Sequence, residues 1–189
     1  YVFANAGEAD AALSTFAEPY FANAEFAHGS HATNVFGGVT PYYWPNVKEL
    51  IFSGYSKSGN VASLSPKPTY VKNAETNIWE INMTGYAPTP GTATLGDNDL
   101  MWFPSTEFKQ ATGFGKNTTY VPVDMYHACS WITFLVMGDT VTGAANTTYT
   151  LTSLNIANID NEANVVCTGS STINSASTVW TANEDVKTA

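Results

Sequence analysis

The sequence contains no arginine, and its seven lysines are outnumbered by sixteen acidic residues, which gives a formal net charge of −9. Proteins that bind nucleic acids need a basic surface to neutralise phosphates, and arginine is the side chain that pairs best with phosphate and guanine. The charge balance therefore excludes a nucleic-acid-binding role. It argues equally against binding to an anionic membrane surface.

Long apolar runs and cysteines are also scarce. The longest apolar stretch, residues 132–137, has the length of a strand, whereas a spanning helix needs about twenty apolar residues. Cys129 and Cys167 are too few for a disulfide framework, and their spacing is not that of a metal site. We favour two buried thiols in strands, and a single bridge that closes a long loop is the alternative. Because no basic or apolar leader follows Tyr1, we interpret the chain as a mature or trimmed form.

Candidate metal ligands do not form a convincing set. His28 and His31 lie close together but His127 is a hundred residues away, and no cysteine or carboxylate stands at a matching spacing. We interpret them as a loop pair and a core histidine held by a hydrogen bond. Asp97 and Asp99 lack the remaining ligands of a calcium loop and are more typical of turn capping. We therefore expect no metal dependence.

Catalytic motifs are missing as well. Ser130 follows Cys129 and lies near His127, but no Gly-x-Ser-x-Gly turn surrounds it. No glycine loop for phosphate is present, and no pair of carboxylates is singled out for glycoside hydrolysis. We therefore predict no catalytic residues, no cofactor and no enzymatic activity, and the sequence leaves any ligand-binding residues unknown.

The residues that are abundant favour β structure. Hydrophobic residues make up 44% and aromatic residues 13% of the chain, and charged residues only 12%. Threonine and aromatic side chains suit strands, while asparagine and glycine suit turns. Short apolar runs between regularly spaced turn residues predict strands at Glu49–Tyr55, Trp79–Met83, Tyr120–Met137, Thr148–Ile159 and Ala163–Cys167. The one helix candidate is the alanine-rich segment Glu8–Phe16.

These patterns predict an all-β protein, specifically an antiparallel β-sandwich of about seven strands. We expect one domain over residues 1–189. Alternation within the predicted strands assigns to the core Trp44, Leu50, Phe52, Trp79, Ile81, Ile132, Phe134, Val136, Leu151, Leu154 and Ile156.

The stretch PYYWPNVKELIFSGYS, residues 41–56, concentrates aromatic side chains and allows two interpretations. In the first, Tyr42, Tyr43 and Trp44 pack a turn that Pro45 fixes, and Phe52 faces the core. In the second, these rings form a stacking platform for sugars. That platform would require at least two of the rings to be exposed and coplanar.

Five segments together resemble bacterial fimbrillin-like proteins, the pilin and accessory subunits of type V pili. They are PYFANAEF at 19–26, YYWPNVKELIFSGYS at 42–56, DLMWF at 99–103, VPVDMYHACSWITFLV at 121–136 and YTLTSLNIANI at 149–159. They occur in the family's order, and the resemblance covers about residues 19–180. It is to the N-terminal domain of such subunits.

This resemblance implies a transthyretin-like β-sandwich. The N-terminal lead, residues 1–26, would pack on the sandwich, and about residues 180–189 would be a tail or the start of a linker to a missing second domain. With the lead covering an edge or groove, the isolated chain would stay monomeric. The lead carries several apolar anchors, among them Phe3, Tyr20, Phe21 and Phe26.

The resemblance also implies a function. The chain would be a structural or adhesive pilus (fimbria) subunit at the surface of a Gram-negative bacterium, in the outer membrane or in an extracellular pilus. Its partners would be other subunits, joined by exchange of β-strands, and a host or bacterial surface ligand. The membrane would be reached only through a lipid anchor that has been removed. The alternative from the residues alone is a secreted or surface-anchored carbohydrate-binding module.

Overall fold

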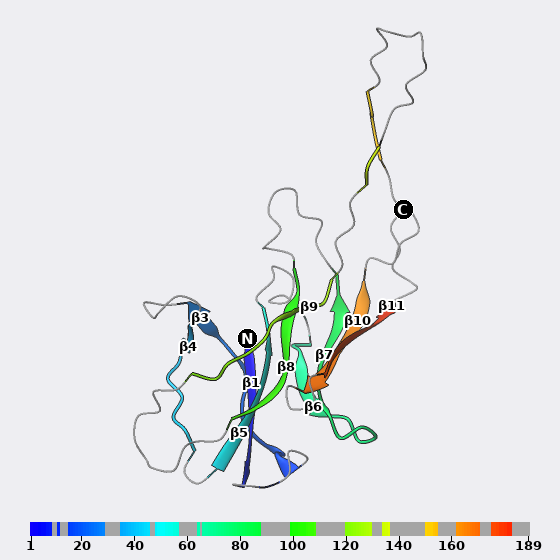
Figure 1. Cartoon of the computed structure of the whole chain (residues 1–189). Helices are drawn as coiled ribbons and strands as arrows, with labels where there is room; N and C mark the ends of the chain where they lie inside the picture. Colours follow the sequence, from blue (N-terminus) through cyan, green and yellow to red (C-terminus); the bar gives the residue numbers. More distant parts are fainter. Residues whose placement is uncertain are drawn as a thin grey trace.

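The fold of the protein is all-β in a computed structural model (Figure 1). No helix in the described part of the chain is long and apolar enough to cross a membrane. The structure describes residues 1–8, 11, 15–28, 35–45, 48–56, 64, 66–87, 99–108, 120–129, 134–136, 150–154, 162–170 and 175–182. Their strands are β1 (Val2–Glu8), β2 (Glu18–Ala24), β3 (Phe26–His28), β4 (Phe36–Gly38), β5 (Lys48–Tyr55), β6 (Thr69–Lys72), β7 (Trp79–Tyr86), β8 (Met101–Phe108), β9 (Tyr126–His127), β10 (Ala163–Ser170) and β11 (Ser175–Ala182).

Nine of the strands form one sheet, and β3 and β4 form a second, small one. The main sheet runs in the order β2-β1-β5-β8-β10-β7-β6, with β9 beside β8 and β11 beside β10. All neighbours are antiparallel except β8 and β10, which are joined by one parallel pair, Ser105 and Ser170. The sheet is therefore mixed, whereas a wholly antiparallel arrangement was predicted.

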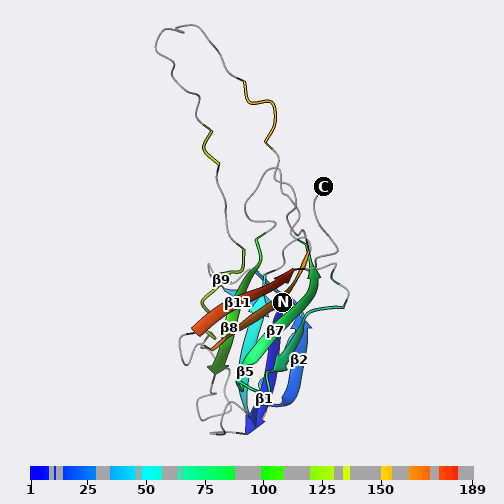
Figure 2. The same ribbon diagram turned by 90° about the vertical axis from the view of Figure 1, so that its right-hand side faces the viewer.

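That single parallel pair divides the main sheet into two antiparallel halves. One half contains β2, β1, β5 and β8, and the other contains β6, β7, β10 and β11. The halves pack against each other. The Phe3 ring of β1, in one half, stacks on Tyr70 of β6, in the other, with centroids 5.4 Å apart. Figure 2 shows the sheet curving so that β11 crosses in front of β8.

Asn23 brings the free ends of the two halves together. Its side-chain amide donates to the Pro68 carbonyl, just before β6, at 2.8 Å, and its oxygen accepts from the Tyr55 hydroxyl at 2.5 Å. Asn23 has φ of 50°, a left-handed conformation that asparagine tolerates better than most residues. The register between β1 and β2 shifts between Val2 and Ala4, opposite this residue. The sheet is consequently nearly closed.

The interior lies between the two halves. Its main cluster contains Phe3, Tyr55, Leu64, Ile81, Met83, Tyr86, Leu100, Trp102, Ala128, Val165 and Cys167, and a smaller cluster contains Phe16, Ile51 and Trp79. Gly54 allows a close backbone approach: a Cβ there would lie 2.5 Å from the Tyr1 carbonyl oxygen and 2.6 Å from the Phe103 ring. Only glycine fits this position without displacing backbone.

Several sequence predictions are confirmed. The predicted strand Glu49–Tyr55 is part of β5, Trp79–Met83 begins β7, and Ala163–Cys167 begins β10. Alternation along β7 buries Trp79, Ile81 and Met83 and leaves Glu80 and Asn82 partly exposed. Of the predicted core residues, Leu50, Trp79 and Ile81 are buried.

The predicted strand Tyr120–Met137 is wrong. Within its described residues, only Tyr126 and His127 are paired, as β9, and residues 120–125 and 134–136 are not strand. Phe134 and Val136, assigned to the core, are 51% and 57% exposed. Ile132 lies outside the described residues. Pro122 contributes to the difference, because proline has no N–H for a ladder.

The predicted strand Thr148–Ile159 is also wrong over its described part. Residues 150–154 have no regular structure, and Leu151 and Leu154 are 60% and 53% exposed. Ile156 lies outside the described residues. The expected helix Glu8–Phe16 is contradicted at its first residue, since Glu8 ends β1, and most of its other residues lie outside the described ones.

The physical reason for these errors is that other strands fill the interior. Phe3 of β1 and Trp102 of β8 are 2% and 1% exposed, and neither was assigned to the core. β11 was missed because its sequence, SASTVWTA, has little apolar character; it overlaps the expected C-terminal tail. An apolar run can form a core strand only where an edge of the sheet remains for it to pair with.

Both cysteines are thiols in the structure. Cys167 lies on β10 and is buried, and burial raises the pKa of its thiol to about 12. Cys129 follows β9, and its pKa is also raised, mainly by burial. Since the thiolate is the nucleophile, we expect both to react slowly with a thiol reagent at neutral pH.

The buried Cys167 thiol predicts a loss of stability at alkaline pH. Its ordinary pKa of 9.0 applies in the unfolded chain, and the raised value applies when folded, so the stabilisation is complete below pH 9 and lost as pH rises to about 12. The loss should be about 1.4 kcal/mol for each pH unit in this window. Urea unfolding between pH 8 and 10 measures the total dependence, to which Cys129 and the buried Tyr55 and Tyr70 also contribute because their pKa values are raised. The Cys167 part is the difference between the unmodified chain and a variant without this thiol. A Cys167→Val variant should show a flatter dependence, and an unchanged slope would contradict the assignment.

Candidate functional site

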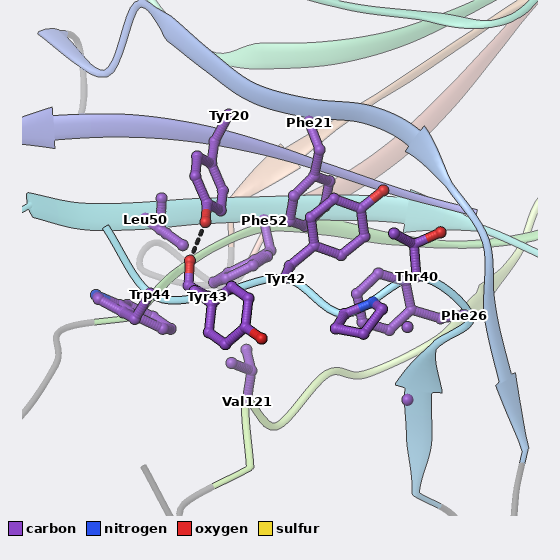
Figure 3. A pocket seen from close by; sticks show the side chains of 13 residues that line it. Tyr20, Phe21, Phe26, Thr40, Tyr42, Tyr43, Trp44, Leu50, Phe52 and Val121 are labelled. Carbon is purple, nitrogen blue, oxygen red and sulfur yellow. Dashed lines mark hydrogen bonds between the residues drawn. The ribbon is translucent and has the colours of Figure 1, made fainter. Parts of the chain in front are cut away.

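The described surface contains an aromatic-lined cavity, referred to below as the aromatic pocket. It has a volume of about 350 Å³ and lies between the edge of the main sheet and the small β3–β4 sheet (Figure 3). Its lining comes from four strands, from the segment that leads into β5, and from Val121 in the segment before β9. The residues are Tyr20, Phe21, Phe26, Gly37, Gly38, Thr40, Pro41, Tyr42, Tyr43, Trp44, Leu50, Phe52 and Val121.

Hydrogen bonds fix the segment that carries the outer wall of the pocket. The Trp44 indole Nε1 donates to the Lys48 carbonyl at 3.0 Å, and the Tyr20 hydroxyl donates to the Tyr43 carbonyl. Pro41 and Pro45 restrict φ on either side of the three aromatic residues. The segment is therefore attached to β2 at one point and to the start of β5 at another.

Ring-to-ring contacts build the floor. Phe21 lies at the centre, with its ring centroid 4.4 Å from Tyr42, 6.0 Å from Phe26 and 6.3 Å from Phe52. Trp44 contacts Phe52 at 6.0 Å. These separations are those of favourable tilted aromatic pairs, so the floor is an ordered apolar surface.

The outer rings remain accessible. Tyr43 is 82% exposed and Tyr42 is 42% exposed, while Trp44 and Phe52 are half-buried. The expectation that Tyr43 packs the turn is therefore wrong, whereas Tyr42 does pack, against Phe21 and Phe26. Phe52 faces the pocket with Trp44 and Phe21 instead of the core. The reason is that the edge strand β2 and the β3–β4 hairpin provide this stretch with a separate aromatic surface.

The chemistry of the pocket is that of an apolar receptor. Its polar side-chain groups are the hydroxyls of Tyr20, Tyr42, Tyr43 and Thr40 and the indole N–H of Trp44, which donates to the Lys48 carbonyl. None of the lining residues is acidic, basic or an amide. Ligand pockets normally combine an apolar lining with a few convergent polar groups that fix orientation. This pocket therefore suits an apolar group better than a highly hydroxylated one.

A second unusual feature is the exposure of two apolar segments, residues 134–136 and 150–154, which are together referred to below as the apolar arm. Both lie beyond the end of the sheet and away from it in two perpendicular views (Figures 1 and 2). Leu135 is 82% exposed, and Phe134, Val136, Leu151 and Leu154 are each more than half exposed. Burial of one such side chain is worth about 1.5–3 kcal/mol, so covering the arm would be strongly favourable.

The histidines singled out from the sequence do not meet in the structure. His127 is not a core residue as expected: its side chain is 65% exposed, and Nδ1 lies 2.5 Å from Asp99 Oδ2. It is exposed because β9 is a two-residue strand that pairs only with β8 and lies off the main strand order, and both of its residues are exposed. His28 packs edge-on against Phe36 with centroids 5.9 Å apart.

The remaining candidates, His31, Asp97 and Ser130, lie outside the described residues. Asp99 was expected to cap a turn; its side chain instead contacts His127. No group of three or more metal-ligating side chains occurs among the residues that the structure places.

Sequence reasoning identified three of the seven aromatic residues that line the aromatic pocket. It singled out Tyr42, Tyr43 and Trp44 but treated Tyr20 and Phe21 only as anchors of the lead, and it put Phe52 in the core. These residues meet because β1 pairs with both β2 and β5. That pairing brings β2 close to β5, although the two strands are about thirty positions apart in the sequence. Comparison of the chain with models of protein families, with curated proteins and with solved structures finds no match.

Proposed function

We propose that the chain is a structural or adhesive subunit of a bacterial surface pilus, acting through contacts between subunits and without catalysis. One structural observation supports this most. The first two strands, β1 and β2, stand at one end of the sheet order, so the edge of β5 is completed by the beginning of the chain. All seven residues of β1 pair with β5, from Val2 opposite Gly54 to Glu8 opposite Lys48.

This arrangement is what strand complementation requires. A strand that completes an exposed edge satisfies its backbone groups and buries alternate side chains, and an equivalent strand from a neighbour can do the same. β1 buries the consecutive residues 3–7, so both of its faces are covered, and Phe3 is the large side chain that it places in the core. If β1 and β2 were removed, the edge of β5 would be open to a strand from another subunit.

The assignment to a transthyretin-like antiparallel sandwich is part of the same proposal. Its support is the division of the main sheet into two antiparallel halves that enclose the core and are joined by one residue pair. The partners proposed for the chain are other pilus subunits and a host or bacterial surface ligand. The proposed location is the outer membrane or extracellular pilus of a Gram-negative bacterium.

The alternative, a carbohydrate-binding module, is favoured by the two exposed tyrosine rings of the aromatic pocket. The composition of the pocket argues against it. Sugar hydroxyls are best fixed by paired donors and acceptors such as carboxylates and amides, and the lining contains neither. We therefore place the pilus role first.

Immunogold electron microscopy tests this proposal. An antibody raised against the purified chain should label filaments on intact cells of the source bacterium, and a deletion of the gene should remove the labelled filaments. The matched control is pre-immune serum on the same cells. Labelling confined to the cell interior, or filaments that persist unchanged and unlabelled in both strains, would rule out the pilus role.

A further inference from the structure

The aromatic pocket and the apolar arm are both apolar and both accessible in the described structure. Exposed apolar surfaces of this kind mark sites of protein contact. The five large side chains of the arm are each more than half exposed, and Tyr43 at the pocket rim is 82% exposed. Covering either surface would remove apolar area from water. Because both surfaces are apolar, the arm of one copy could cover the pocket of another.

We propose that the apolar arm of one copy of this chain docks into the aromatic pocket of the next copy. The inference deepens the proposed subunit role and rests on it for its biological setting. The pocket volume of about 350 Å³ lies at the lower end of the range for ligand sites, which suits a few aliphatic side chains. Leu135, the most exposed residue of the arm, is the side chain that we expect to enter it.

Charge does not oppose this contact locally. The described residues of the arm, FLV at 134–136 and TLTSL at 150–154, carry no charged group, and neither does the pocket lining. No ion therefore has to lose its hydration on docking. Each copy as a whole has a formal charge of −9, so copies repel at long range, and added salt should strengthen the association by screening.

The positions of the two surfaces determine the kind of assembly. In both perpendicular views the two segments of the arm lie beyond one end of the sheet (Figures 1 and 2). The pocket is elsewhere on the molecule, because most of its lining comes from β2, β5, the β3–β4 hairpin and the segment before β5. A contact between two different surfaces of the same chain is heterologous, and it propagates into an open filament or a ring. The resemblance alone implies a monomer, and the exposed arm argues against that expectation.

Two variants that each disable one surface test the inference. Leu135→Asp damages the arm and keeps the pocket, and Tyr43→Asp damages the pocket and keeps the arm. Val179→Asp is the matched control, because Val179 on β11 is a 51% exposed apolar residue outside both surfaces. Light scattering after size-exclusion chromatography measures the mass of each 189-residue protein at increasing concentration, and circular dichroism confirms that each is folded.

We expect the unmodified chain and Val179→Asp to form species larger than dimers, in amounts that rise with concentration and salt. Each single variant should associate at least about tenfold more weakly. A mixture of Leu135→Asp and Tyr43→Asp should form dimers and nothing larger, because it contains one intact arm and one intact pocket.

Several results would overturn the inference. These are an unmodified chain that stays monomeric, variants that associate as well as Val179→Asp, a mixture that forms no dimer, or a pocket that binds an oligosaccharide in a Tyr43-dependent way without affecting association. If the association experiment contradicts the arm–pocket contact but filaments on cells are labelled, only this contact is wrong and the pilus role stands. If the association experiment supports the arm–pocket contact but no filaments are labelled, the pilus role is wrong and self-association through this contact stands.

Discussion

A chain that lacks residues 1–8 should fail to fold into a stable monomer, and a synthetic peptide with the sequence of residues 1–8 should restore the fold. β1 lies between β2 and β5 and pairs with both, so its removal separates β2 from the sheet and exposes the edge of β5. It also removes Phe3, which is 2% exposed and contacts Tyr55 and Tyr70. An open apolar edge of this kind promotes aggregation.

The measurement is thermal unfolding and size-exclusion chromatography of the shortened chain with and without the peptide. The control peptide carries aspartate in place of Phe3, because it keeps the backbone donors and acceptors but cannot fill the core. Rescue by the native peptide alone would show that strand and side chain act together. If the shortened chain unfolds at the same temperature and elutes as the same species as the intact one, strand complementation at β5 is wrong.

The second large effect is expected at Trp102. This residue of β8 is 1% exposed, its Nε1 donates to the Thr178 hydroxyl at 3.0 Å, and its ring contacts Tyr126. Trp102→Ala should lower the free energy of unfolding by about 3–5 kcal/mol, because it creates a large cavity between the two halves of the sheet. For a chain of this length, that corresponds to a fall in melting temperature of roughly 10 °C.

The matched substitution is Phe134→Ala. The sequence pattern predicts that Phe134 lies in a core strand. If that prediction held, Phe134→Ala would lower the free energy of unfolding as much as Trp102→Ala. In the structure it is 51% exposed on the apolar arm, so the change in the free energy of unfolding should stay within about 0.5 kcal/mol. Urea unfolding at a concentration low enough to keep the chain monomeric distinguishes the two. A loss of several kcal/mol at Phe134 would place the arm inside the fold.

The local strand signals were reliable where short-range physics determines the outcome. Alternation of apolar and polar residues identified β7, and apolar residues after a proline turn identified β5. Aromatic clustering likewise identified Tyr42, Tyr43 and Trp44 as notable residues. These signals are local because the side-chain period of a strand and the turn preferences of proline are properties of a few consecutive residues.

The amino-acid sequence by itself determined that the chain is all-β and that two of its strands lie at β5 and β7. Only the tertiary structure decided which apolar segments enter the core. β1 and β8 pair with β5 on its two sides and place Phe3 and Trp102 in the interior, so the more apolar residues 134–136 remain outside. Strand pairing is a competition between distant segments for the same edges, and hydrophobicity within one segment does not reveal which competitor is placed there.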